Sequence, residues 1–160
     1  MNSRKLALLD RDGTLIEHIP YLQDPEQVRL LPGTVDGLLG LRKRGFWLVL
    51  VSNQSGVGRG YFSIAAVEAV HQRLQELLSP HGAQLDLLLY CPHAPDHGCD
   101  CRKPAPGMAH QACVQLKANL EGAIMVGDSD CDMQLAERLQ IDGYRICPGL
   151  PSLELVAAQL

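Results

Sequence analysis

Two aspartates stand two positions apart at the end of the first apolar stretch, in the segment Asp10-Arg11-Asp12-Gly13-Thr14. In extended backbone, side chains at positions i and i+2 point to the same side, so both carboxylates could address one small volume. Like charges held close repel each other unless a cation lies beside them, and an oxygen-coordinated divalent cation, Mg²⁺ above all, relieves that repulsion. A solvated Asp-Gly turn is the alternative interpretation of the same residues.

A second acidic group follows a later apolar stretch. Asp128 comes directly after four apolar residues, and Asp130 and Asp132 lie close behind it. Any of these could instead cap the next helix or charge its first turn. Three acidic residues within five positions exceed what capping needs. We therefore expect a third carboxylate beside the first pair, with water and a substrate phosphate completing a Mg²⁺ site.

Hydroxyl, amide and cationic side chains occupy two further segments. Residues 52–60, Ser-Asn-Gln-Ser-Gly-Val-Gly-Arg-Gly, could present donors to phosphate oxygens, with Arg59 as a cation. They lack the Gly-Lys-Ser/Thr ending of a P-loop and the full dinucleotide-binding fingerprint. Arg102 and Lys103 form a basic pair before a predicted helix, for which a solvated pair is the alternative. Carboxylates, a hydroxyl and a lysine are what phosphoryl transfer through an aspartyl phosphate requires.

Three cysteines and one histidine cluster in a short loop, namely Cys91, His93, Cys99 and Cys101. Three thiolates and an imidazole are the closed tetrahedral ligand set of a structural zinc site, and soft thiolates select Zn²⁺ over Mg²⁺. A disulfide is the competing interpretation, which the odd number of cysteines and a reducing setting disfavour. His97 is an alternative ligand at a worse spacing. We expect zinc to brace the loop so that Arg102 and Lys103 face the phosphate.

Short apolar stretches alternate with longer stretches of helical period. We expect strands over 6–10, 46–51, 85–91, 123–127 and 143–147, and helices over 35–44, 63–78, 106–116, 130–139 and 152–159. This order predicts an α/β fold with a doubly wound, mainly parallel, Rossmann-like sheet covered by helices on both faces. Asp10, Ser52, Cys91 and Asp128 each follow a predicted strand, at the edge where such sheets bind ligands. Residues 16–33, with three prolines, predict a loop or small flap over the strand ends.

Length and composition limit the class of protein. The chain has 160 residues, 46% of them hydrophobic, which suits one domain over residues 1–160. Fourteen Lys and Arg against 18 Asp and Glu give a net charge of −4, which argues against nucleic acid as the main partner but not against a small anionic substrate. No apolar stretch approaches the ~20 residues of a membrane helix or suits a signal peptide. We expect a cytoplasmic monomer without a membrane partner.

Taken in order, these segments resemble the four motifs of the haloacid dehalogenase superfamily of phosphatases. The resemblance implies Asp10 as nucleophile, Asp12 as acid/base, and Ser52 and Lys103 as phosphate-binding groups. It also implies Mg²⁺ held by Asp10, Asp128 and the backbone carbonyl of Asp12. Arg102 would recognise the substrate beside these groups.

The same resemblance implies a small phosphorylated sugar or alcohol as substrate, since no large cap domain is inserted between the motifs. The substrate contacts that we expect are Arg11, His18, Tyr21, Asn53, Gln54, Ser55, Arg59 and Ser129. A phosphorylatable receiver-type signalling domain is an alternative from another class, although its phosphorylated aspartate would follow a middle strand. A zinc-dependent binding module is a third interpretation.

Overall fold

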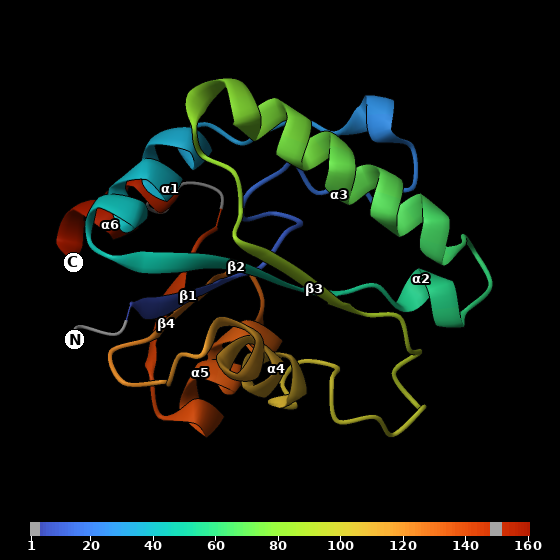
Figure 1. Cartoon of the computed structure of the whole chain (residues 1–160). Helices are drawn as coiled ribbons and strands as arrows, with labels where there is room; N and C mark the ends of the chain where they lie inside the picture. The colour runs from blue at the N-terminus through green and yellow to red at the C-terminus, as the bar shows by residue number, and fades with distance from the viewer. Residues whose placement is uncertain (1–3, 148–151) are drawn as a thin grey trace.

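Five parallel strands form one sheet in the order β3-β2-β1-β4-β5 (Figure 1). They are β1 (Lys5–Leu9), β2 (Phe46–Asn53), β3 (Leu87–Cys91), β4 (Ile124–Gly127) and β5 (Asp142–Arg145). The computed structural model describes residues 4–147 and 152–160. The chain adds β2 and β3 on one side of β1, and β4 and β5 on the other. The carboxyl end of β1 is therefore the topological switch point, where doubly wound folds bind their ligands.

Helices cover both faces of the sheet, as the nearly continuous apolar strands predict. The helices α1 (Thr34–Lys43), α3 (Ile64–Leu78) and α6 (Leu153–Gln159) pack on one face, and α4 (Gly107–Leu116) and α5 (Asp130–Leu139) on the other (Figure 1). Side chains alternate along β1, so Ala7 and Leu9 join the first core while Leu6 and Leu8 join the second. Three short elements complete the fold: α2 (Ser55–Gly58) and the 3₁₀ turns η1 (Pro25–Gln27) and η2 (Ser79–His81).

The sequence predicts the main elements to within two or three residues, and Ser63 caps α3 by accepting a hydrogen bond from the Ala66 N–H at 3.2 Å. The last strand departs from its prediction. It runs over Asp142–Arg145 instead of 143–147, and three of its four residues are exposed. An edge strand pairs on one side only, here with β4, and therefore tolerates polar side chains. The helix α2 was not predicted, because its four residues include two glycines.

The flap over residues 16–33 is anchored to the core of the protein. Ile16, Leu22 and Val28 are almost fully buried, and Ile16 forms an isolated β-bridge with Leu30. At the end of the flap, the Thr34 hydroxyl donates a hydrogen bond to the Leu15 carbonyl at 2.8 Å. These contacts give the flap a fixed base beside the carboxyl ends of the strands. Within residues 4–147 and 152–160, no helix has the length and apolar character needed to cross a membrane.

Candidate active site

Asp10 follows β1 directly and shares a buried ion-pair network with Lys103. The Lys103 Nζ lies 2.8 Å from Asp10 Oδ1 and 2.7 Å from Asp132 Oδ1, and Lys103 is only 3% exposed. Burial by itself lowers the pKa of Lys103, but the carboxylates of Asp10 and Asp132 outweigh it and raise that pKa above its ordinary value. The ammonium therefore stays charged beside Asp10.

Asp132 combines a structural role with a place in this network. It lies in the first turn of α5, where its Oδ2 accepts hydrogen bonds from the Ser129 N–H at 3.2 Å and the Ser129 hydroxyl at 2.7 Å. This capping box leaves Oδ1 free for Lys103. The motif around Asp128 includes Asp132, but its contact with Lys103 could not be predicted, because it joins residues 29 positions apart.

Three carboxylates gather at the switch point. One oxygen from each of Asp10, Asp128 and Asp132 lies within 4.8 Å of the others. Burial, followed by the hydrogen bond and charge of Asp10, raises the pKa of Asp128 to about 7. Lys103 can neutralise one of the three negative charges, so a divalent cation with a preference for oxygen ligands fits the remaining two. Asp10 and Asp128 were both expected in the Mg²⁺ site.

Gly13 brings the loop after β1 against Asp128. Its φ of +76° lies in the left-handed region that glycine tolerates, and a Cβ at this position would collide with the Asp128 carboxylate. Both the backbone conformation and the neighbouring Asp128 carboxylate therefore require glycine here. No motif analysis of Gly13 alone indicates this contact, which joins loops more than a hundred residues apart.

The Asp12 carboxylate does not belong to this cluster but bonds to Arg11 and Gln54. Its two oxygens accept hydrogen bonds from the Arg11 guanidinium at 3.1–3.2 Å, and Oδ2 accepts one from Gln54 Nε2 at 3.2 Å. Gln54 Nε2 also donates to the Ser52 hydroxyl oxygen at 2.7 Å. With Gln54 as donor to its oxygen, Ser52 keeps its own hydroxyl hydrogen for another acceptor, as phosphate binding would require.

Asn53 fixes the backbone that carries the lysine. Its Nδ2 donates to the Lys103 carbonyl at 3.1 Å, and its Oδ1 accepts from the Lys103 N–H at 2.9 Å. Both ends of the amide are therefore used to join β2 to the loop that follows the cysteine cluster. Asn53, predicted to contact substrate, lines the cleft described next and also makes these two bonds to the Lys103 backbone.

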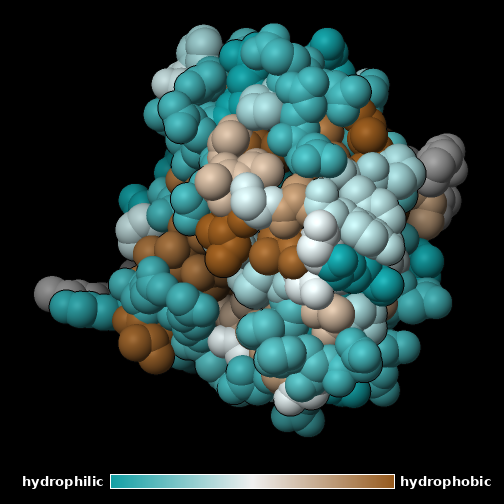
Figure 2. Space-filling view, turned by 90° about the vertical axis from the view of Figure 1, so that its right-hand side faces the viewer, coloured by the Kyte–Doolittle hydropathy of each residue, from teal (hydrophilic) through white to brown (hydrophobic). Residues whose placement is uncertain are grey.

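A cleft of about 320 Å³ opens beside Asp12, between the flap and the loop after β2. Of the expected substrate contacts, Arg11, His18, Tyr21, Asn53, Gln54 and Ser55 line it. The flap and Phe62 supply its apolar wall, which sequence analysis did not anticipate. Figure 2 faces the side to which the carboxyl ends of β2 and β3 point, and hydrophobic side chains gather near its centre among hydrophilic ones.

Three expected contacts lie elsewhere among the described residues. Arg59 is exposed, with its Nε 3.4 Å from the Ser55 hydroxyl oxygen. Arg102 borders a separate hollow of about 240 Å³, which Lys103 and Arg138 also line. Ser129 is engaged with Asp132, as described above. None of these three lines the cleft beside Asp12.

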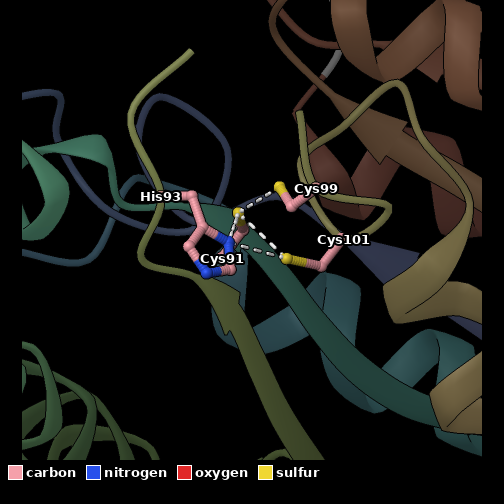
Figure 3. Close-up of side chains that lie close together, drawn as sticks. All are labelled: Cys91, His93, Cys99 and Cys101. Carbon is pink, nitrogen blue, oxygen red and sulfur yellow. Dashed lines mark hydrogen bonds between the residues drawn. The ribbon is translucent and has the colours of Figure 1, made fainter. Parts of the chain in front are cut away.

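The four predicted zinc ligands converge at the end of β3 (Figure 3). The Cys91 sulfur lies 3.1 Å from the Cys101 sulfur and 3.6 Å from the Cys99 sulfur, and His93 Nδ1 lies 3.2 Å from Cys101. A zinc tetrahedron with bonds of ~2.3 Å has edges of roughly 3.8 Å, so these slightly shorter separations suit a shared ion. Burial, then the thiol of Cys101, raises the pKa of Cys91 to about 12, so the free thiol is protonated.

The cysteine loop is docked on the rest of the site through its backbone. The Gly58 N–H donates to the Pro92 carbonyl and the Gln54 N–H to the Cys91 carbonyl, both at 2.8 Å. At the other end, the Gly107 N–H donates to the Asp100 carbonyl at 2.8 Å, and a Cβ on Gly107 would strike that carbonyl oxygen. The loop therefore connects α2 and α4 directly to the segment that holds Lys103.

Comparison with known proteins places these features in a family. Residues 5–142 match the polynucleotide kinase 3 phosphatase family. A D-glycero-beta-D-manno-heptose-1,7-bisphosphate 7-phosphatase from Pseudomonas putida is 42% identical over 133 residues, covering 82% of this chain and 76% of its own length. The enzyme of the same name from Pseudomonas aeruginosa is 40% identical over 135 residues, covering 84% of this chain and 76% of its own length.

A solved structure agrees with this relationship. The D,D-heptose 1,7-bisphosphate phosphatase from B. bronchiseptica, complexed with magnesium and phosphate, superposes with a TM-score of 0.86 at 33% identity and 97% coverage of both chains. The family resemblance inferred from the motifs is confirmed by these matches, as is the parallel α/β fold. Magnesium in that relative agrees with the oxygen-rich cluster found here.

Proposed function

This chain belongs to the polynucleotide kinase 3 phosphatase family of haloacid dehalogenase phosphatases, and on that premise we propose that it removes the 7-phosphate of D-glycero-D-manno-heptose 1,7-bisphosphate. The observation that carries this proposal is the pairing of Asp10 with a fully charged Lys103 at the switch point, next to a cleft of about 320 Å³. A cleft of that size suits one monosaccharide and not a polymer. The identity of the sugar is taken from the names of the similar enzymes.

The chemistry that we propose divides between the two aspartates. Asp10 attacks phosphorus and becomes an aspartyl phosphate, while Lys103 and the Ser52 hydroxyl bind the phosphate oxygens. Asp12 gives a proton to the leaving alkoxide and then takes one from the water that hydrolyses the intermediate. Lys103 is already 2.8 Å from Asp10, so it can neutralise charge on a phosphate seated there without a large movement.

Mg²⁺ fits the carboxylates of Asp10 and Asp128, with the backbone carbonyl of Asp12 as the further ligand that the family resemblance implies. Such an ion supplies charge neutralisation for the phosphate and for the clustered acids. We assign Asp132 to holding Lys103 and not to the metal, because its two oxygens already bond to that ammonium and to Ser129.

We also propose one structural Zn²⁺ held by Cys91, His93, Cys99 and Cys101. All four positions of a tetrahedral ion would be filled by protein, which leaves no open position for substrate. The backbone bonds of this loop to Gly58 and Gly107 support a bracing role, because they transmit the loop's position to Lys103 and its neighbours.

Histidinol phosphate is the second candidate substrate, and two features favour it. In heptose bisphosphate phosphatases we expect a lysine directly after the residue that corresponds to Asp128, and this chain has Ser129 there. The interval between His93 and Cys99 is also short, at five residues. Serine carries no charge, and its hydroxyl is bonded to Asp132, so this position offers a substrate neither a cation nor a free hydroxyl hydrogen.

The test is side-by-side turnover of heptose 1,7-bisphosphate, histidinol phosphate and other sugar phosphates, with Mg²⁺ present. We expect the highest kcat/KM for release of the 7-phosphate of the heptose and no activity in Asp10→Asn. Preferred hydrolysis of histidinol phosphate would replace the heptose assignment. A stable phosphoprotein without turnover would instead favour a receiver-type domain.

A further inference from the structure

Asp12 is the one acidic side chain among the described residues that line the cleft. Asp10 is not part of that lining, and Asp128 borders a different hollow, which shares His18 with the cleft. A substrate alcohol in the cleft would therefore meet Asp12, while its phosphate meets Asp10 and Lys103. The position of the Asp12 carboxylate thus decides whether protons can pass between the cleft and the phosphate site.

Two buried donors determine that position. Arg11 is 1% exposed and holds both Asp12 oxygens through Nε and Nη2, and Gln54 is 5% exposed and donates to Oδ2. Asp12 is the acidic side chain that the structure pairs with the Arg11 guanidinium, at 3.1 Å, and 21% of its side-chain surface stays exposed.

The donor hydrogens of Gln54 are fully used by the protein. One hydrogen of Nε2 lies on the Ser52 oxygen at 2.7 Å and the other on Asp12 at 3.2 Å. Gln54 therefore cannot donate to a substrate from Nε2 unless one of these bonds breaks. Both Gln54 and Arg11 line the cleft, yet their polar contacts are directed to Asp12 and Ser52.

We propose, resting on the phosphatase function above, that Arg11 and Gln54 are positioning residues that hold Asp12 as the base for hydrolysis of the aspartyl phosphate. In that step a water oxygen bonds to phosphorus, and the bond from phosphorus to the Asp10 oxygen breaks with its electron pair returning to Asp10. The proton of the water passes to Asp12. Every side chain that bonds to the Asp12 oxygens is an N–H donor. Such donors fix the orientation of a carboxylate and favour its ionised form, which is the form that can take a proton from water.

The test separates the two chemical steps with p-nitrophenyl phosphate, whose leaving group needs no proton from an acid. The variants are Arg11→Met and Gln54→Met, which remove donors while keeping the length of the side chain. In rapid-quench experiments we expect a burst of about one nitrophenolate per site, followed by turnover at least about tenfold slower than wild type, since general base catalysis contributes about 10²–10⁴. Phosphorylated protein should accumulate during that slow phase.

Two further variants make the result specific. Arg11→Lys keeps the positive charge but not the paired N–H donors of the guanidinium, and we expect its turnover to lie between those of Arg11→Met and wild type. Arg42→Met removes an arginine that pairs with Asp86 outside the cleft, and it should show wild-type kinetics. If Arg11→Met does not fold, as judged by circular dichroism, Gln54→Met and Gln54→Glu carry the test, and the glutamate should slow turnover further by repelling Asp12.

A raised KM with unchanged kcat would overturn the inference, because it would make these residues substrate contacts. Equal slowing of both steps without a burst, or no effect at all, would also overturn it. A wild-type protein without any phosphatase activity would refute the proposed function itself, so the two failures are distinguishable.

Discussion

Replacing Lys103 by methionine tests how much the buried ion pairs of Lys103 with Asp10 and Asp132 contribute to stability. The substitution keeps the approximate length of the side chain but removes the cation that lies 2.8 Å from Asp10 and 2.7 Å from Asp132. Both carboxylates are nearly buried, and Asp132 has no exposed surface. Removing one partner from a buried ion pair costs ~3–5 kcal/mol. For a chain of this length each kcal/mol lowers Tm by about 2–4 °C, so we expect a decrease of roughly 6–20 °C.

The assay is thermal unfolding at pH 7.5 in EDTA, repeated with millimolar Mg²⁺. We expect Mg²⁺ to narrow the difference between variant and wild type, because the ion supplies positive charge to the same carboxylates. Arg42→Met is the matched control: its partner Asp86 and its own side chain are 17% and 32% exposed, so its loss should cost about 1 kcal/mol or less. A Lys103→Met protein as stable as this control would refute the reasoning.

Three further predictions concern the metals and the loop that contacts them. Because the pKa of Asp128 is raised to about 7, the metal-free protein should lose stability as pH rises from about 4 through 7. Mg²⁺ binds the ionised carboxylate, so it should raise Tm more at pH 8 than at pH 5.5. Equal increases in Tm at both pH values would contradict this. Gly13→Ala should lower Mg²⁺ affinity and activity at least about tenfold, since its Cβ meets Asp128. Gly45→Ala, at a similar φ of +80° with open space, should leave both unchanged, and equal effects at the two glycines would point to backbone strain alone. Elemental analysis should find one zinc per chain, lost in Cys101→Ser with a lower Tm but kept in Cys113→Ser; a metal-free wild type of full stability would remove the zinc site.

Much of the fold could be predicted because its pattern is local. Apolar strands alternating with amphipathic helices determine a parallel sheet, and polar residues at strand ends indicate where its ligand site lies. The bounds of the edge strand β5, Asp142–Arg145, differ from the predicted 143–147, because its residues are mostly polar and exposed. Its pairing with β4, and not its own composition, makes it a strand.

The site was predictable in its residue types but not in its internal bonds. The structure brings Asp10 to Lys103, and the four cysteine and histidine residues of the cysteine loop to one another, as motif and spacing predict. The bond from Lys103 to Asp132, and the bonds from Arg11 and Gln54 to Asp12, depend on how loops from different strands meet. Side-chain chemistry permits several partners for each donor, and only the packed arrangement selects one.

The most direct test of the account is to trap the covalent intermediate. Acid quenching during turnover, followed by borohydride reduction, converts an acyl phosphate of aspartate to homoserine, which peptide mass spectrometry can locate. We predict homoserine at position 10 in wild type and none in Asp10→Asn. A modified residue elsewhere, or turnover without any reducible intermediate, would contradict Asp10 as the nucleophile.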